Sequence, residues 1–197
     1  MHSERGSAER VPLAFSDAAQ VPEDACDLTL DPNTAHTRLI LSDDNRKVTR
    51  VEDHQLFPDH PERFDAVPQV LCVESLTGRC YWEAEWSGND AVISVSYKGI
   101  NRKGWSDCWF GSNDKSWSLS CSGNSFTVHH NNNYTDIPVH SSSKRAGVYV
   151  DTSTASLTHT ISHTYTHLTP HSLNPSVLDF GLVMIPHCLC VILNSLL

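Results

Sequence analysis

The sequence predicts an all-β fold, an antiparallel β-sandwich, on three observations. Apolar and polar residues alternate over several short segments, which is the side-chain period of a β-strand. Turn-forming Gly, Asn, Asp and Pro separate these segments at roughly 8–12-residue intervals. No stretch between residues 78 and 197 shows the spacing of an amphipathic helix. Strands with one apolar face need a second layer to cover that face, which favours two packed sheets.

The part of the chain before residue 78 predicts short strands separated by turns. Residues 1–24 are polar, charged and aperiodic, so we expect a disordered tail or a linker there. The strands that follow are short, because Pro, Asp and Asn interrupt each apolar run after a few positions. They are expected at residues 25–31, 39–41, 47–51 and 70–73.

The segment Gly78–Tyr97 gives the clearest strand signal. Trp82 and Trp86 fall on one face of the first run, and both are expected in the core. Ser87–Asp90 is typical of a turn. The second run, residues 91–97, places Ile, Val and Tyr on one face and serines on the other. Two such runs joined by a short Gly/Asn/Asp break predict an antiparallel hairpin.

The chain after residue 97 predicts an irregular stretch and then further short strands. An irregular stretch at residues 98–115 contains three glycines together with Trp105 and Trp109. These two tryptophans fit two interpretations equally, because aromatic residues cap cores and also dominate interfaces. Trp117 lies in an alternating run and is expected in the core. Further strands are expected at residues 116–121, 125–129 and 145–151.

Charge and composition argue against several classes of partner. The formal net charge of the 197-residue chain is −9, and its Lys and Arg residues form no dense cluster. A nucleic-acid partner is therefore not expected. The apolar tail Leu182–Leu197 is too short for a membrane helix and contains Pro186 and Asn194, so no membrane partner is expected.

The cysteines favour a reducing compartment. There are seven, an odd number, and no two form a CxxC pair of the kind that binds zinc or exchanges disulfides. We therefore expect free thiols and a cytoplasmic location. The first residues contain no apolar run of signal-peptide length, so the sequon Asn133-Tyr134-Thr135 is interpreted as accidental.

Three short motifs identify a family resemblance. They are Leu30-Asp31-Pro32, Trp82–Glu85 and Val150-Asp151. These resemble the LDP, WEVE and LD motifs of PRY-SPRY domains, as found in fish tripartite-motif proteins, NOD-like receptors and stonefish-type cytolysins. Lesser matches connect them from about residue 25 to residue 151.

The resemblance implies a bent β-sandwich of the concanavalin-like jelly-roll type, with a short N-terminal PRY segment. The PRY part is expected at about residues 25–76 and the SPRY part at about 77–193. The family's role implies a non-catalytic module that binds a protein partner through its loops, in innate immune recognition or signalling. Two alternatives stay open. The chain could be the substrate-recognition end of a tripartite-motif ubiquitin ligase whose RING is absent here, or a fragment of a secreted cytolysin subunit.

The sequence departs from the family pattern after Asp151. An LSFY-like strand and the loop behind it are expected to be missing, a shortening of about ten residues judged against ordinary strand and loop lengths. A gap beside the strand at residues 145–151 should leave backbone groups unpaired, so residues 152–175 are expected to be the weakest part of the domain.

Catalytic and metal chemistry find little support in the residue pattern. His159, His163, His167 and His171 are spaced by four, but the surrounding threonines favour a strand, on which these rings are too far apart to share an ion. A solvated strand face is the favoured interpretation. No GxSxG or GxGxxG motif is present, so no enzyme activity, cofactor or small-molecule substrate is expected.

The partner-binding face is expected in three loop segments at residues 50–63, 101–109 and 129–133. These segments are rich in the Arg, Trp, His and Asn residues that supply directed contacts at interfaces. The predicted partner-binding residues are Arg50, Arg63, Asn101, Arg102, Trp105, Trp109, His129, His130 and Asn131.

Overall fold

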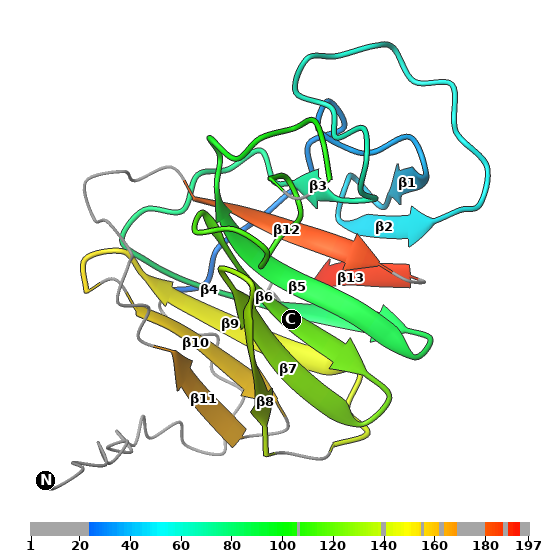
Figure 1. Ribbon diagram of the computed structural model, residues 1–197. Helices are drawn as coiled ribbons and strands as arrows, with labels where there is room; N and C mark the ends of the chain where they lie inside the picture. Colours follow the sequence, from blue (N-terminus) through cyan, green and yellow to red (C-terminus); the bar gives the residue numbers. More distant parts are fainter. Residues whose placement is uncertain are drawn as a thin grey trace, which may run out of the picture.

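The computed structural model is a sandwich of two antiparallel sheets (Figure 1). It describes residues 24–105, 107–138, 141–154, 156–161, 164–168, 180–186 and 189–193. These residues contain no α-helix, which confirms the all-β prediction. No membrane-spanning helix is therefore found among them.

One sheet has seven strands and the other has six. In spatial order the first contains β1 (Leu39–Ser42), β2 (Lys47–Arg50), β13 (Leu189–Leu193), β4 (Arg79–Ser87), β9 (Arg145–Asp151), β10 (Ser156–Ile161) and β11 (Thr164–Leu168). The second contains β3 (Val70–Leu71), β12 (Phe180–Pro186), β5 (Asp90–Tyr97), β6 (Ser116–Ser122), β7 (Ser125–His130) and β8 (Asn133–Ile137). The strands expected from alternation at β1, β2, β3, β6, β7 and β9 are all present, whereas residues 25–31 contribute only isolated bridges.

The expected hairpin at Gly78–Tyr97 is wrong, although both of its strands exist. β4 pairs with β9 and β13 in one sheet, and β5 pairs with β6 and β12 in the other. The short Gly88–Asn89 connection therefore crosses from sheet to sheet. The physical reason is that the apolar faces of both strands are buried when they oppose each other across the core.

The main core lies between the sheets. Its largest side chains include Trp82 from β4 and Trp117 from β6, and Trp86 joins the same cluster. All three tryptophans are buried, as alternation predicted. Ile93 and Leu119, paired across β5 and β6, extend the apolar layer.

A second, smaller core covers the opposite face of the six-stranded sheet. It contains Phe64, Val67, Leu71, Ile100, Cys108 and Phe110. Ser94 on β5 and Ser118 on β6, which alternation places on an outward face, are buried, and the Ser94 hydroxyl donates to Ser118 Oγ at 2.9 Å. A buried hydroxyl needs such a partner, since an unpaired one is costly. The loops before β3 and after β5 thus add a third layer at one end of the sandwich.

The C-terminal strands join the N-terminal ones to the rest of the molecule. β13 lies between β2 and β4, and β12 lies between β3 and β5 (Figure 1). The gap expected after Asp151 is absent, because β10 pairs with β9 along its whole length. Whether the chain is shorter here than its family stays a prediction.

The histidine array does not lie on one solvated strand. His159 is on β10 and fully buried, which corrects the expected solvated face, and His167 is on the neighbouring strand β11. Burial lowers the pKa of His159 to about 4. His163 and His171 lie outside the described residues, as do residues 1–23 of the expected tail.

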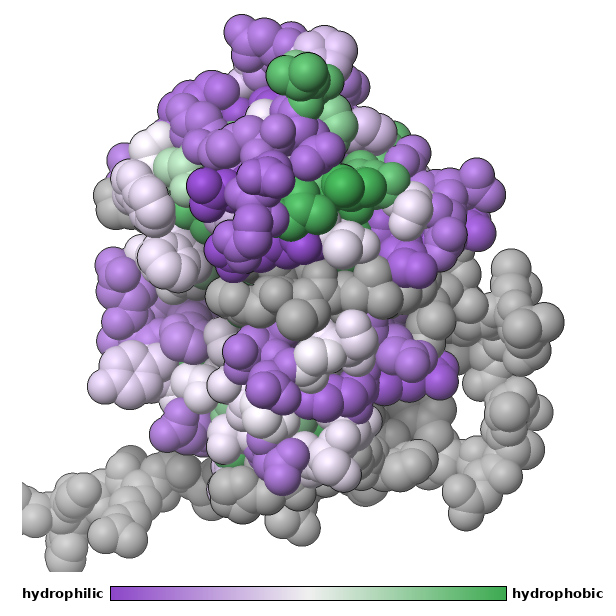
Figure 2. Space-filling view, turned by 90° about the vertical axis from the view of Figure 1, so that its right-hand side faces the viewer, coloured by the Kyte–Doolittle hydropathy of each residue, from purple (hydrophilic) through white to green (hydrophobic). Residues whose placement is uncertain are grey.

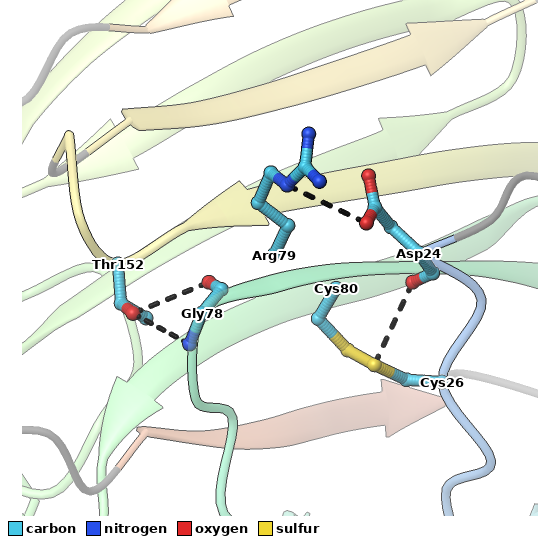
Figure 3. The surroundings of a disulfide bond; sticks show 6 residues. All are labelled: Asp24, Cys26, Gly78, Arg79, Cys80 and Thr152. Atoms are coloured by element: carbon cyan, nitrogen blue, oxygen red, sulfur yellow. Dashed lines mark hydrogen bonds and ion pairs between the residues drawn. A yellow bond between two sulfur atoms is a disulfide. The ribbon is translucent and has the colours of Figure 1, made fainter.

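The expectation that every thiol is reduced is also wrong. Cys26 and Cys80 form a disulfide bond (Figure 3). Cys72, Cys108 and Cys121 are free and buried, and burial raises the pKa of the Cys121 thiol to about 12. The disulfide was not visible in the sequence, because the two positions approach only when the N-terminal segment runs beside β4.

The side of the molecule that carries β1 and β2 is mostly hydrophilic (Figure 2). Its largest hydrophobic patches lie in the upper half, where the loops between β1 and β3 lie. Exposed apolar residues of this part of the chain include Ile40, Leu56 and Phe57.

Candidate functional site

A groove of about 890 Å³ lies on the outer face of the six-stranded sheet. Its floor consists of Val92 on β5, Ser118 and Ser120 on β6, and His129 on β7. Because strand residues two apart point to the same face, Ser118 and Ser120 reach the groove while Trp117 and Leu119 point into the core. Two sets of loops form the sides of the groove, called its walls below, and both lie in the upper part of Figure 1.

The first wall is the loop between β5 and β6. Trp105 and Trp109 line the groove and remain 68% and 46% exposed, while Phe110 beside them is buried. Gly111 sits close to β7 at a φ of +86°, and a Cβ at this position would lie 2.8 Å from His129 Cβ. Glycine is therefore required for the loop to turn against the sheet.

The second wall comes from the N-terminal loops. Its side chains include His36, Arg38, Arg50, His54 and Asp65. The rings of His36 and His54 are 5.8 Å apart, and the Thr37 hydroxyl lies 2.5 Å from His54 Nδ1. Asp65 Oδ1 accepts a hydrogen bond from the Gly104 N–H at 3.3 Å, which connects this wall to the tryptophan loop.

His36 is held in one neutral tautomer. Its Nδ1 accepts the N–H of Arg38 at 3.0 Å, so its Nε2 carries the proton and donates to the Asp65 carbonyl at 3.2 Å. Burial lowers the pKa of His36, and the nearby charges of His54 and Arg38 lower it further. Burial also lowers the pKa of His129 on the groove floor. Both ring nitrogens of His36 thus form hydrogen bonds with backbone groups, those of Arg38 and Asp65.

Four of the nine predicted partner-binding residues meet in this groove. They are Arg50, Trp105, Trp109 and His129. The other five are Arg63, Asn101, Arg102, His130 and Asn131, which do not line it. Asn101 and Asn131 are exposed, and Asn131 has a positive φ in the turn between β7 and β8.

Arg63 and Arg102 have structural partners. Arg63 is buried, and its guanidinium donates to the carbonyls of Pro32, Ala35 and Pro58 at 2.6–2.9 Å. Arg102 forms an ion pair with Glu62 at 2.9 Å and donates to the Lys98 carbonyl at 2.6 Å. These side chains fasten loops to one another.

His130 also has a structural partner. Its ring stacks on Trp117 with centroids 4.5 Å apart, and its Nδ1 lies 2.8 Å from the Ser116 carbonyl. The neighbouring His129 faces the groove instead, which follows from the alternation along β7.

Sequence reasoning predicted part of the N-terminal wall, namely Arg50 and the segment 50–63 that contains His54, and missed His36, Arg38 and Asp65. These three residues carry no local motif, and their meeting with β5, β6 and β7 depends on the packing of distant loops. On the floor His129 was predicted, and the signal for Ser118 and Ser120 was the run of small polar residues at alternate positions of β6.

The groove is suited to binding. Its exposed aromatic side chains and several donors match the composition of recognition sites, which combine apolar surface with a few placed polar groups. In the part of the chain that the structure describes, no three His, Cys, Asp or Glu side chains gather as metal ligands would.

Sequence comparisons match both halves of the chain. The model of PRY, the SPRY-associated domain, matches residues 28–76. Stonustoxin subunit beta of Synanceia horrida is 45% identical over 130 residues, covering 64% of this chain and 18% of the toxin subunit. Tripartite motif-containing protein 16 of Mus musculus is 43% identical over 132 residues, covering 64% of this chain and 23% of that protein. The chain thus spans less than a quarter of the length of either relative.

The fold matches a solved structure. The crystal structure of the TRIM65 PSpry domain superposes with a TM-score of 0.74 at 23% identity. The match covers 87% of this chain and 92% of that domain, so the two share a fold over nearly the whole of the latter.

Proposed function

Since this chain is a PRY-SPRY domain protein, similar to those of tripartite-motif proteins and stonefish toxins, we propose that it binds a protein partner in the groove between its N-terminal loops and the Trp105–Trp109 loop. The domain itself acts by recognition and not by catalysis. One observation is central to this proposal: two large aromatic side chains remain exposed on the wall of the groove.

The exposure of Trp105 and Trp109 supports the interface interpretation of these two residues. Trp82, Trp86 and Trp117 show that this fold buries tryptophans wherever they serve the core. Trp105 and Trp109 instead keep about half or more of their surface in solvent. Tryptophan is among the residues most enriched at interface hot spots, and burying such a ring on association contributes strongly to affinity.

The test compares groove and core tryptophans in one protein. The domain is used to capture partners from cell lysate, and affinity for the captured protein is then measured for Trp105→Ala and Trp109→Ala. Each change is expected to weaken binding by about 1–3 kcal/mol. Both variants should keep the melting temperature of the wild type, because the rings are exposed.

Trp117→Phe is the matched control. It alters a buried ring that does not line the groove, so it should lower the melting temperature with affinity following only in step with unfolding. If Trp105→Ala and Trp109→Ala behave like this control, the two rings are structural and the binding face lies elsewhere.

A second part of the proposal concerns the biological setting of this domain. We propose a role in innate immune recognition or signalling, supported by the resemblance to fish immune proteins with PRY-SPRY domains. Two alternatives use the same module. One is the recognition end of a tripartite-motif ubiquitin ligase, and the other is part of a cytolysin subunit like that of Synanceia horrida. A longer transcript encoding a RING or a toxin region would decide between them.

A further inference from the structure

Several arginines of this protein form ion pairs with carboxylates, and Arg38 differs from them. Arg46 pairs with Asp27 at 2.9 Å, Arg102 pairs with Glu62 at 2.9 Å, and Arg145 pairs with Glu83. Among the described residues Arg38 has no such ion pair, while its Nε is shielded from solvent without an acceptor, as are those of Arg46, Arg63 and Arg102. The positive charge of Arg38 is therefore not balanced by a carboxylate of the described residues, and a carboxylate supplied from outside would be favoured.

The backbone holds Arg38 in place at the groove. Its N–H donates to His36 Nδ1, and its carbonyl accepts the N–H of Val51, each at 3.0 Å. Arg50 pairs with Leu39, so the backbones of Arg38 and Arg50 are close at the open end of the β1–β2 hairpin, and both side chains line the groove. Two guanidinium groups on one fixed hairpin form a cationic end of the groove.

The charge in the groove is opposite to that of the molecule. The chain carries a formal net charge of −9, yet the lining contains Arg38 and Arg50 against a single described carboxylate, Asp65. That carboxylate already accepts a backbone N–H from Gly104. The groove therefore favours an anionic ligand.

The other wall favours apolar contact. Trp105 and Trp109 face the groove with Val67 and Phe110 among the apolar lining residues. Arginine recognises carboxylates through charge-assisted hydrogen bonds, and exposed indoles bind apolar side chains. A ligand that fits both walls carries an acidic group and an apolar group on one short segment.

We propose that the groove recognises a linear protein segment with an Asp or Glu side chain bound by Arg38 and Arg50 and an apolar side chain bound between Trp105 and Trp109. This inference rests on the proposed function and names the chemistry of its partner. Arg38 and Arg50 supply the specificity, and the tryptophans supply most of the contact area.

The probe is a phage-displayed library of random 12-residue peptides, selected on the folded domain. Enriched peptides are expected to share one acidic position at a fixed distance from an aromatic or large aliphatic one. The strongest peptide is then synthesised and its affinity measured by fluorescence anisotropy. Arg38→Gln and Arg50→Gln should each weaken binding about tenfold or more, and the wild-type affinity should fall as salt increases.

Arg46→Gln is the matched control, because Arg46 is an arginine of the same hairpin that pairs with Asp27 and does not line the groove. It should leave the affinity unchanged. Replacing the acidic residue of the peptide by its amide should weaken binding to the wild type, yet change little in the Arg38→Gln variant.

Three outcomes overturn the proposal in distinguishable ways. If enriched peptides are neutral and lose affinity in Trp105→Ala but not in Arg38→Gln, the acidic specificity is wrong while the proposed function stands. If neither Trp105→Ala nor Arg38→Gln changes the affinity, the groove is not the binding site and both proposals fail. If the library yields no enriched sequence, the groove does not recognise a linear segment.

Discussion

Cys26 and Cys80 are joined by a disulfide bond across 54 positions of the sequence. The bond attaches the segment before β1 to β4, where the Cys26 N–H donates to the Tyr81 carbonyl at 2.9 Å and the Tyr81 N–H donates to the Asp24 carbonyl at 2.7 Å. β13 pairs with β4 only from Glu83 to Ser87. The N-terminal segment thus pairs with β4 at Tyr81, beyond the point where the pairing of β13 with β4 ends, and the disulfide lies beside this contact (Figure 3).

Removing this disulfide is expected to destabilise the domain. A Cys26→Ser/Cys80→Ala variant should lose about 2–4 kcal/mol of unfolding free energy, because closing so long a loop restricts the unfolded chain. Urea denaturation measures the loss. Adding a reductant should bring the wild type down to the stability of the variant and should leave the variant unchanged.

The same bond bears on the compartment. Disulfides persist mainly in oxidising environments, so a bonded pair removes one reason for expecting the cytoplasm. The cytoplasmic location stays a prediction. Quenching intact cells with acid and then alkylating the denatured protein tests it: modification of both Cys26 and Cys80 indicates a reducing compartment, and protection of both indicates an oxidising one.

Replacing Arg63 is expected to reduce stability in the absence of any partner. Its guanidinium donates to three backbone carbonyls from a buried position, so Arg63→Ala leaves those acceptors unpaired. We expect a loss of about 2–4 kcal/mol in urea denaturation. Arg46→Ala, which removes an exposed ion pair, should cost less than about 1 kcal/mol. Equal, small effects would return Arg63 to the candidate binding residues.

The ring of Tyr81 packs against Gly147 on β9 and leaves no room for a larger side chain there. A Cβ at this position would be 2.6 Å from Tyr81 Oη and 3.0 Å from its Cε2, so Gly147→Ala must displace Tyr81. We expect a loss of about 1–3 kcal/mol of unfolding free energy, typical of overpacking. Gly99→Ala has no atom within 4 Å of its new Cβ and serves as the control. Combining Gly147→Ala with Tyr81→Ala should remove most of the clash, and a purely additive loss would contradict this explanation.

The stability of the domain should fall in mild acid. Burial lowers the folded-state pKa of His159 from 6.5 to about 4, so the unfolded chain binds the proton first as pH falls. The stability present above pH 6.5 is therefore lost progressively down to about pH 4, by up to about 3 kcal/mol.

Urea denaturation at a series of pH values measures this slope. His159→Gln should flatten it, leaving the smaller contributions of His36 and His129, whose pKa values burial also lowers. His60→Gln, which alters a histidine outside the groove, is the control. A slope unchanged by His159→Gln would place the pH sensitivity elsewhere.

Much of the fold could be predicted from local pattern, and the groove only in part. Trp82, Trp86 and Trp117 are buried as alternation required, because a strand has only two faces and a tryptophan occupies the covered one. Trp105 and Trp109 could be placed in a loop but not assigned to a role. Arg63 has the composition of an interface residue, yet it is surrounded by carbonyls from loops that the sequence does not place near it.

By itself, the sequence determined that this chain folds as short antiparallel strands in two layers, because side-chain alternation and turn residues act over a few neighbouring positions. The tertiary structure alone decided which strands pair. It put β4 and β5 in different sheets, inserted β12 and β13 beside N-terminal strands, brought Cys26 to Cys80, and placed Arg38 in one groove with the tryptophan loop. Each of these depends on burying apolar faces that are distant in sequence, and such packing is a property of the whole chain.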